Sequence, residues 1–440
     1  MAYKVGAAQL EITPPLGINL AGYFYERKAE GMLDSLFVNS IVVADEVTEW
    51  VLVSCDLIGI TLDLTNKIRE EVAKKTGFRW DQILICCTHT HTGPAVSPNS
   101  APYVREEVYF QFVMQRISDC VVLAKSRLEL AEAFCGRGKV EGVAFNRRFW
   151  MQSGKVETNP GVGNPQIVRP AGPIDPEVGV VFFRSSATGQ LLSIIVNYAL
   201  HADIVEGNFI SPDFPGYMRT TIKQVLGINL PILFTRGAGG DINHIDVNLN
   251  PNSPTRAKLA EKIGKLLAFE VLKIIEAPRQ ERCEGAVWLG LENIKLPLRE
   301  IEEEEIEVAK KLIATEKPTD NDCPEVIRAR RILKIAQHAF EPIETEVQVL
   351  GLGDVAFVGL PTEIFVELGL ALKAKSQFPF TWVIDLANDE FDYIPTKRAY
   401  SEGGYEVNSS PLAAGAGEEL IDVALEILNL QGNNVRKGNK

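Results

Sequence analysis

Short apolar runs rich in β-branched residues alternate along this chain with longer stretches of helical spacing. The apolar runs predict strands at residues 38–44, 51–55, 83–87, 178–183, 192–199, 232–235 and 356–360. The helical spacing predicts helices at residues 63–75, 104–129, 216–226, 255–276, 364–373 and 418–428. This alternation is typical of an α/β fold, in which strand ends followed by polar turns carry the ligand site.

Two stretches differ from this pattern. Residues 150–176 are rich in Pro, Gly and Asn, which predicts a long loop or lid. Residues 300–340 combine an acidic run with later arginines at helical spacing, which predicts a charged helical insertion with a solvated face. The length of 440 residues allows one large domain or two fused ones, and we expect a polar, frayed tail at 431–440.

Charge and cysteine usage narrow the class of protein. A net charge of −13 and a pI near 5.1 argue against a nucleic-acid partner, because phosphates are neutralised by clustered Lys and Arg. The N-terminal residues lack the pattern of a signal peptide, and no apolar run is long enough to cross a bilayer. The seven cysteines form no CxxC pair. These features predict a cytoplasmic protein in a reducing compartment.

Candidate metal ligands are few, because the chain has five histidines. His89 and His91 form a His-Thr-His turn directly after the strand predicted at 83–87. If the extended backbone continues, alternate side chains point the same way and both imidazoles face one cavity. Imidazole is a common zinc ligand at neutral pH. The turn alone fits a metal site and a polar turn with two surface histidines equally well.

Three further histidines complete the set. His201 ends the strand predicted at 192–199, where a lone histidine is more often structural than a ligand. His244 follows a Gly-Gly-Asp turn, in which Asp241 is a candidate for orienting an imidazole. His338 lies in a helical stretch, and we expect it to be structural.

Taken together, these segments resemble the neutral/alkaline non-lysosomal ceramidase family, zinc amidases that cleave the N-acyl bond of ceramide. Residues 12–17 with 22–23 resemble its N-terminal signature, and 88–94 are similar to its HTHSGP block. The other similar blocks are 146–147 (NR), 197–201 (NFAVH), 211–213 with 216–217 (SGD…GY), 240–243 (GDVSPN), 361–365 (PGEFTT) and 393–396 through 405–406 (YITT…YE). The resemblance extends from about residue 5 to residue 405.

This resemblance implies roles for individual residues. It implies zinc ligands at His89, His201, Glu363 and Tyr393, with His91 beside the attacking water, where it either accepts the proton or orients the water. It also implies that Arg147 and Tyr405 donate to the oxyanion or the acyl oxygen, and that Asp213 and Asp241 orient the ligands. Without the resemblance, Glu363 would be interpreted as a carboxylate at a helix N-terminus and Tyr393 as a half-buried loop aromatic.

The implied fold is one large catalytic domain over residues 1–430, with the charged insertion at 300–340 within it. Its mixed β-sheets are flanked by helices, like the family's N-terminal catalytic domain. The implied activity is zinc-dependent hydrolysis of an amide bond. The chain has Pro361-Thr362 where the family has Pro-Gly, and Ser211-Pro212 where it has Ser-Gly. Because few residues follow the last motif, we expect no immunoglobulin-like C-terminal domain of the kind found in longer members. We therefore expect a small, soluble N-acylated substrate. The alternatives are an ester or phosphoester metallohydrolase and a non-catalytic metal- or ligand-binding relative.

Overall fold

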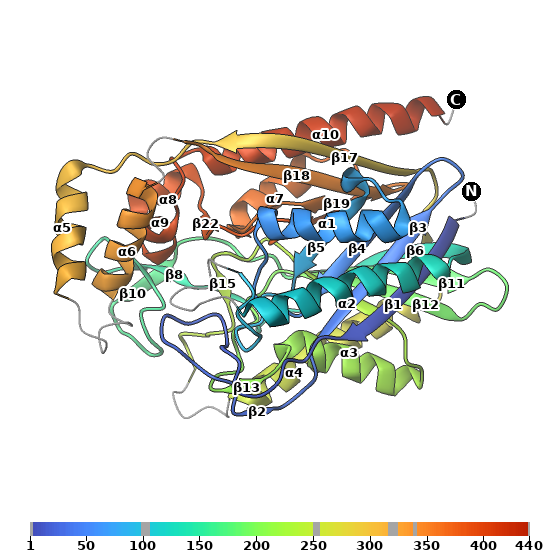
Figure 1. Ribbon diagram of the computed structural model, residues 1–440, viewed down its shortest axis with the longest axis horizontal. Helices are drawn as coiled ribbons and strands as arrows, with labels where there is room; N and C mark the ends of the chain where they lie inside the picture. Colours follow the sequence, from blue (N-terminus) through green and yellow to red (C-terminus); the bar gives the residue numbers. More distant parts are fainter. Residues whose placement is uncertain (1–2, 98–105, 250–255, 316–323, 338–340, 439–440) are drawn as a thin grey trace.

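A computed structural model describes residues 3–97, 106–249, 256–315, 324–337 and 341–438. Its centre is a nine-stranded sheet with the order β14-β12-β11-β6-β1-β3-β4-β5, in which β16 also pairs with β6 (Figure 1). The strands of this sheet are β1 (Tyr3–Glu11), β3 (Phe37–Ala44), β4 (Glu49–Cys55), β5 (Ile83–Cys87), β6 (Glu129–Lys139), β11 (Glu177–Ser185), β12 (Leu191–Tyr198), β14 (Ile232–Arg236) and β16 (Glu281–Arg282). The pairs β4–β5 and β12–β14 are parallel, and the other pairings are antiparallel.

A second sheet has the order β17-β18-β19-β21. Its strands are β17 (Val287–Leu296), β18 (Ile343–Leu352), β19 (Val355–Gly359) and β21 (Phe380–Ile384). Large buried side chains fill the space between the two sheets, among them Trp50, Phe357 and Trp382. The two sheets therefore share one apolar layer, which explains why their strands are nearly continuous apolar runs.

Helices cover the outer faces of both sheets. The helices over the first sheet are α1 (Leu62–Thr76), α2 (Glu107–Ser126), α3 (Asp213–Leu226) and α4 (Arg256–Ile275). Those over the second sheet are α7 (Val366–Lys375) and α10 (Ala416–Gly438), and α10 lies along β17 and β18 in Figure 1. The result is a helix–sheet–sheet–helix arrangement, which confirms the predicted α/β class with mixed sheets. No helix of the described residues is long and apolar enough to span a bilayer.

The predicted elements agree with the structure to within a few residues, apart from the two stretches that follow. The expected loop at 150–176 contains a small antiparallel sheet of β8 (Arg148–Met151), β9 (Val156–Thr158) and β10 (Ile167–Pro170). The polar tail continues the predicted helix at 418–428, because α10 extends to Gly438. The charged insertion forms the helices α5 (Glu303–Ala314) and α6 (Pro324–Gln337). His338, the start of the helix predicted at 104–129 and Thr255 lie outside the described residues.

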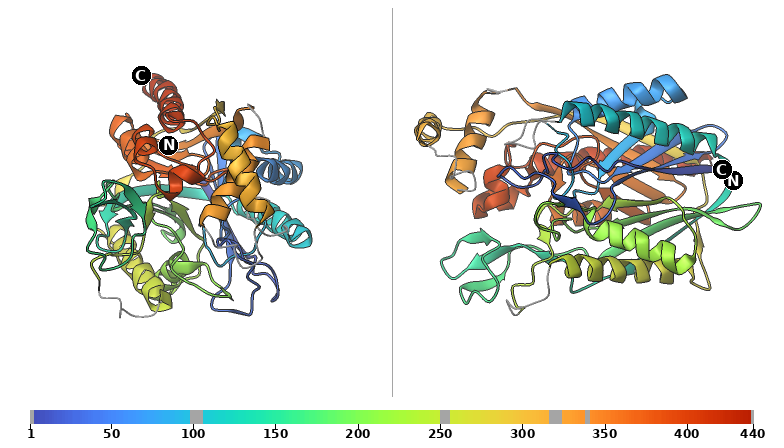
Figure 2. Two further views of the ribbon diagram at one scale, coloured as in Figure 1. Left: turned by 90° about the vertical axis from the view of Figure 1, so that its left-hand side faces the viewer. Right: turned by 60° about the horizontal axis from the view of Figure 1, so that its bottom comes forward.

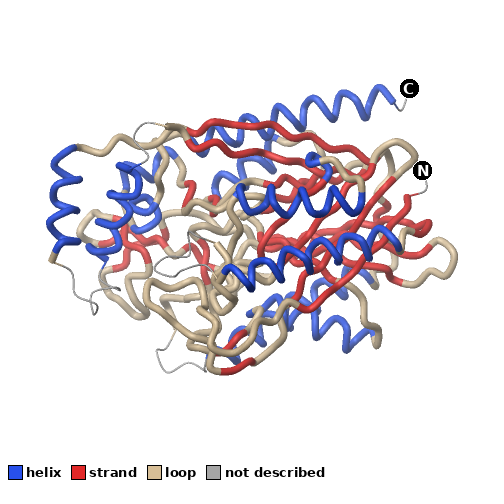
Figure 3. The backbone as a smooth tube through the Cα atoms, viewed as in Figure 1, coloured by secondary structure: helices blue, strands red, loops and turns tan. Residues whose placement is uncertain are grey.

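Several strands end at the same side of the molecule, and the segments that follow them carry the candidate site residues. The Ser54 hydroxyl of β4 donates to the Phe234 carbonyl of β14 at 2.6 Å, although β4 and β14 lie far apart in the sheet order. The sheet therefore curls, and the segments that follow β5, β12 and β14 come together. The segment after β19 joins them from the second sheet. Figure 3 shows the loops gathered between these strand ends and helices α5 and α6.

A buried ion pair connects α1 to the second sheet. The Arg69 guanidinium contacts Glu346 of β18 at 2.6 Å, and both side chains are almost fully buried. We expect Glu346→Ala to lower the free energy of unfolding by about 3 kcal/mol, because it leaves an uncompensated buried charge. Glu344→Ala on the same strand is the control, since its pair with Lys295 is exposed to solvent and contributes little to stability. Equal shifts for both variants in urea denaturation would contradict this prediction.

Candidate active site

Three histidines from two separate segments meet at the strand ends. His89 and His91 follow β5, and His201 follows β12. The ring centroid of His89 lies 4.8 Å from that of His91 and 5.0 Å from that of His201. One ring nitrogen of each histidine lies within 4.8 Å of the others. The structure thus brings together imidazoles that are about 110 residues apart in the sequence.

Backbone carbonyls determine the tautomer of each imidazole. His89 Nδ1 lies 2.7 Å from the Ile58 carbonyl, and His91 Nδ1 lies 2.9 Å from the Gly22 carbonyl. His201 Nδ1 lies 2.9 Å from two carbonyls, those of Gly239 and Ile242. A carbonyl only accepts hydrogen bonds, so we place the proton of each imidazole on Nδ1, and each Nε2 then keeps a lone pair. At His201 the two carbonyls at 2.9 Å outweigh the Arg236 guanidinium, which lies 3.1 Å from the same Nδ1. All three histidines therefore have Nε2 available as a ligand atom.

Glu363 joins the group from the second sheet. Its Oε2 lies 2.8 Å from His201 Nε2 and 3.4 Å from His89 Nε2. Arg236, at the end of β14, contacts the same carboxylate at 3.2 Å and is fully buried. Arg236 thus balances part of the negative charge of Glu363 inside the fold.

The protonation states favour a cation in this group. Burial, together with Arg236 and Arg147, lowers the pKa of His201 to about 3. Burial raises the pKa of Glu363, but its contacts with His89 and His201 outweigh this, and the pKa is well below its usual range. Burial and the neighbouring His89 likewise hold the pKa of His91 well below its usual range. The neutral imidazole of His201 and the carboxylate of Glu363 therefore face each other, each with a lone pair directed at the other. A cation shared by the two groups stabilises such an arrangement.

Of the two contacts that Glu363 Oε2 makes with imidazole nitrogens, the one with His89 has the spacing of a tetrahedral metal site, and the one with His201, at 2.8 Å, is shorter. Two ligands bound at 2.0–2.1 Å in a tetrahedral zinc site lie about 3.3 Å apart. The 3.4 Å between His89 Nε2 and Glu363 Oε2 matches that spacing. His89 Nε2 and His91 Nε2 are buried and have no hydrogen-bond partner among the described residues. Orphaned ring nitrogens directed at one point are what a metal site requires.

Several residues in or directly before the site have a left-handed backbone conformation. His89 has φ +65°, so the extended geometry of β5 ends before it, contrary to the expected continuation of the strand. The two imidazoles still face one site, but through a turn. Thr362, directly before Glu363, has φ +54°, and Asp392, directly before Tyr393, has φ +78°. Such conformations are unfavourable for a β-branched residue, and Thr362 stands where the family pattern has glycine.

Tyr393 reaches the group beside Glu363. The two residues are register partners in the short parallel pair of β20 (Glu363–Ile364) and β22 (Tyr393–Ile394). The buried phenol interacts electrostatically with Glu363 and Arg147. Burial, followed by Glu363, raises the pKa of Tyr393 well above its usual value. A cation bound next to this phenol would have to lower that pKa for Tyr393 to serve as a ligand.

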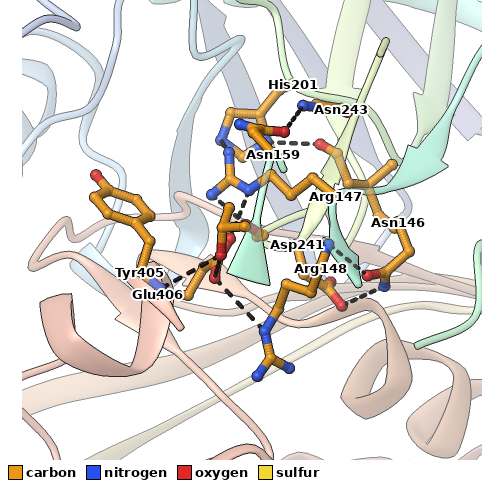
Figure 4. A network of polar contacts seen from close by, with 12 residues as sticks. Asn146, Arg147, Arg148, Asn159, His201, Asp241, Asn243, Tyr405 and Glu406 are labelled. Carbon is orange, nitrogen blue, oxygen red and sulfur yellow. Dashed lines mark hydrogen bonds and ion pairs between the residues drawn. The ribbon is translucent and has the colours of Figure 1, made fainter. Parts of the chain in front are cut away.

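Arg147 is held rigidly next to His201. Its Nε donates to Glu406 at 2.7 Å, and one Nη donates to the Gly240 carbonyl at 2.8 Å. The other Nη lies 3.4 Å from His201 Nε2, so it is directed at the histidine group. Glu406 lies between the guanidinium groups of Arg147 and Arg148 (Figure 4). The arrangement presents one preorganised N–H donor to the site.

Tyr405 is half-buried at the edge of the site, where it begins helix α9 (Tyr405–Ser409). Its ring centroid lies 5.6 Å from that of Tyr393 and 6.4 Å from that of Phe24. Its hydroxyl accepts a hydrogen bond from Arg331 at 3.4 Å. The structure therefore places Tyr405 next to one predicted metal ligand, Tyr393.

Asp213 and Asp241 act on the backbone. Asp213 accepts hydrogen bonds from the backbone N–H groups of Ile204 and Val205, and so fixes the loop after His201. Asp241 accepts from Asn146 and from the backbone of Val366. Burial raises the pKa of each of these two carboxyl groups to about 6. We expected them to orient the ligands, but their carboxylates hold loops, and the carbonyls of other residues orient the imidazoles.

Comparisons with known proteins identify the family of the chain. The sequence profile described as "Neutral/alkaline non-lysosomal ceramidase, N-terminal" matches residues 3–227, half of the chain. The chain belongs to this family. A neutral ceramidase from Pseudomonas aeruginosa is 25% identical over 230 residues, which make up 49% of this chain and 33% of that relative. The match thus spans only a third of the relative's own length.

Solved ceramidase structures share the fold. The crystal structure of the neutral ceramidase from Pseudomonas aeruginosa has a TM-score of 0.77 at 18% identity, covering 97% of this chain and 74% of that one. A ceramidase complexed with C2 gives a TM-score of 0.78 at 18% identity, with coverages of 99% and 76%. The profile match includes His89, His91, Arg147, His201 and Asp213. It ends before Asp241, Glu363, Tyr393 and Tyr405.

Three residues near the ceramidase-like histidine group were not predicted from the sequence as parts of the site. Arg236 and Glu406 are buried partners of Glu363 and Arg147, respectively. The Asp203 carboxylate lies 3.1 Å from His244 Nδ1, in the loop after His201. Arg236 ends a predicted strand and Glu406 belongs to a motif, but nothing in the sequence specifies their charge partners.

Proposed function

We propose that this chain is a zinc-dependent hydrolase that cleaves the amide bond of a small, soluble N-acylated substrate. The observation that carries the proposal is the convergence of three imidazoles, each with Nδ1 on a backbone carbonyl, beside the Glu363 carboxylate. Among the described residues, Nε2 of His89 and Nε2 of His91 have no hydrogen-bond partner. Family membership supports the amide bond as the target. We assign the metal to His89, His201, Glu363 and Tyr393, and leave His91 for proton transfer.

Zn²⁺ in a site of this kind supplies Lewis acidity and lowers the pKa of water to about 7. The residues of the chain perform the remaining steps. His91 accepts a proton from the attacking water through its free Nε2, because its Nδ1–H is held by the Gly22 carbonyl. The water oxygen bonds to the acyl carbon, and negative charge develops on the acyl oxygen. Arg147 and Tyr405 donate hydrogen bonds to that oxygen. The C–N bond then breaks, and His91 returns the proton to the leaving amine.

Charged side chains near the histidines support a polar substrate. Asp203 follows directly after Ala202, whose carbonyl accepts from the backbone N–H of His91, and its side chain is 23% exposed. Arg331 and Asp392 form an ion pair beside Tyr405, with side chains 16% and 30% exposed. A substrate with hydroxyl, carboxylate or amine groups close to the scissile bond suits such surroundings better than one that is wholly apolar there.

A substrate panel tests the proposal. The purified protein is expected to hold zinc in stoichiometric amounts and to hydrolyse at least one of several N-acyl amino acids and N-acyl amino sugars faster than micellar ceramide. A chelator should abolish this hydrolysis, and added Zn²⁺ should restore it. The panel includes an ester and a phosphoester. Faster cleavage of the phosphoester, or full zinc content without any hydrolysis, would contradict an amidase.

A further inference from the structure

The charged insertion is close to the proposed active site. Helices α5 and α6 stand at the end of the molecule where the loops gather (Figures 1 and 2). The two helices pack on each other through a small apolar cluster that includes Ala309, Ala329 and Ile332. The sequence predicted a solvated face for this segment. Arg328 fits that prediction, because its side chain is half exposed and pairs with Glu305 of α5.

Arg331, only three residues further along α6, points toward the body of the protein. One Nη donates to the Ser409 hydroxyl of α9. The other lies 3.0 Å from the Asp392 carboxylate and 3.4 Å from the Tyr405 hydroxyl. The side chain is 16% exposed, against 50% for Arg328. Arg331 therefore connects the insertion to two segments that carry proposed site residues, since Asp392 immediately precedes Tyr393.

Arg331 also restricts the Tyr405 ring. Its guanidinium carbon lies 5.3 Å from the centroid of that ring and 5.5 Å from the centroid of the Phe24 ring. Contacts of this length between a guanidinium and an aromatic ring are attractive. Phe24 belongs to the loop whose Gly22 carbonyl holds His91. The ring of Tyr405 is thus held by an arginine, by Phe24 and by the neighbouring Tyr393.

The direction of the hydrogen bond has a chemical consequence. A guanidinium has only N–H groups, so Arg331 donates and the phenol oxygen of Tyr405 accepts. The O–H of Tyr405 then has to point away from Arg331, which leaves its proton available to another acceptor. A hydroxyl that accepts from a cation is also a stronger donor, because hydrogen bonds in a chain polarise one another.

We propose that Arg331 is a positioning residue, which orients the Tyr405 hydroxyl toward the acyl oxygen of the substrate. Through Arg331, the α5–α6 insertion contributes to the active site. This inference rests on the proposed function, because it assigns Tyr405 the role of oxyanion donor. Arg331 itself does not contact the reacting atoms. Its effect on the rate is transmitted through one hydroxyl group.

A double-mutant cycle tests the inference. Arg331→Met is expected to lower kcat about tenfold, because a misplaced donor loses part of the 10²–10³-fold that one oxyanion donor supplies. KM and zinc content should stay near the wild-type values, and Arg331→Lys should recover part of the loss. In a Tyr405→Phe background, Arg331→Met should cause no further decrease in kcat, since the hydroxyl that it orients is gone. Arg328→Met, on the exposed face of the same helix, is the control and should match the wild type.

Three results would overturn the inference. The first is an unchanged kcat in Arg331→Met. The second is a loss in Arg331→Met that multiplies with that of Tyr405→Phe, because it assigns Arg331 an effect independent of the hydroxyl. Either result, with an active wild type, overturns this inference alone. A zinc-loaded wild type that hydrolyses none of the N-acyl substrates overturns the proposed function and this inference together. Arg331→Lys keeps the cation, so it provides the comparison if Arg331→Met lowers the melting temperature.

Discussion

Replacing His89 by alanine is expected to remove both the bound zinc and the hydrolytic activity. His89 Nε2 lies 3.4 Å from Glu363, and its Nδ1 is held by the Ile58 carbonyl, so the variant loses one preoriented ligand atom of the assigned set. Metal-ion catalysis is worth several kcal/mol, and each 1.36 kcal/mol is a factor of ten in rate, so we expect a loss of about 10³-fold or more. Metal analysis of the purified variant and its activity on the best substrate of the panel give the two measurements.

Two other histidine variants show which of the histidines bind the zinc. His91→Ala is expected to keep the zinc but to lose most of the activity, because we assign His91 to proton transfer. His244→Ala should keep the zinc as well, since His244 pairs with Asp203 outside the group of three. Loss of zinc from His91→Ala would show that all three imidazoles are ligands. Full zinc content and full activity in His89→Ala would rule out the site.

Tyr405→Phe is expected to lower kcat by about 10²–10³, the usual effect of removing one donor to a developing oxyanion. The zinc content should not change, because Tyr405 is not assigned as a ligand. KM should change little, since the hydrogen bond strengthens in the transition state rather than in the bound substrate. Steady-state kinetics with the same substrate, together with metal analysis, test this expectation.

A matched tyrosine serves as the control for Tyr405→Phe. Tyr400, on helix α8 (Lys397–Glu402), uses its hydroxyl on the Leu412 carbonyl and contacts the Ser410 hydroxyl. Tyr400→Phe removes a hydrogen bond of similar kind from the same part of the chain, and kcat should stay near the wild-type value. An equal decrease in both variants would mean that Tyr405 supports the local fold rather than the reaction.

Much of the fold could be predicted from the sequence, because burial on both faces of a strand leaves an apolar run that is visible in one dimension. The strand predicted at 83–87 agrees with β5 residue for residue. The loop predicted at 150–176 was wrong, because Pro, Gly and Asn are also common in the turns of a small sheet. The helical extent of the tail was missed for a related reason, since polar composition alone does not prevent a helix from continuing.

The sequence by itself determined which residue types stand at the strand ends, namely two imidazoles after β5, one after β12 and a carboxylate after β19. It could not determine that these ends meet, because that depends on the curl of the first sheet and on its packing against the second. Only the tertiary structure decided the partners of the buried charges, Arg236 with Glu363 and Arg147 with Glu406. The physical reason is that a buried charge needs a partner in space, and that partner here lies 127 to 259 residues away along the chain.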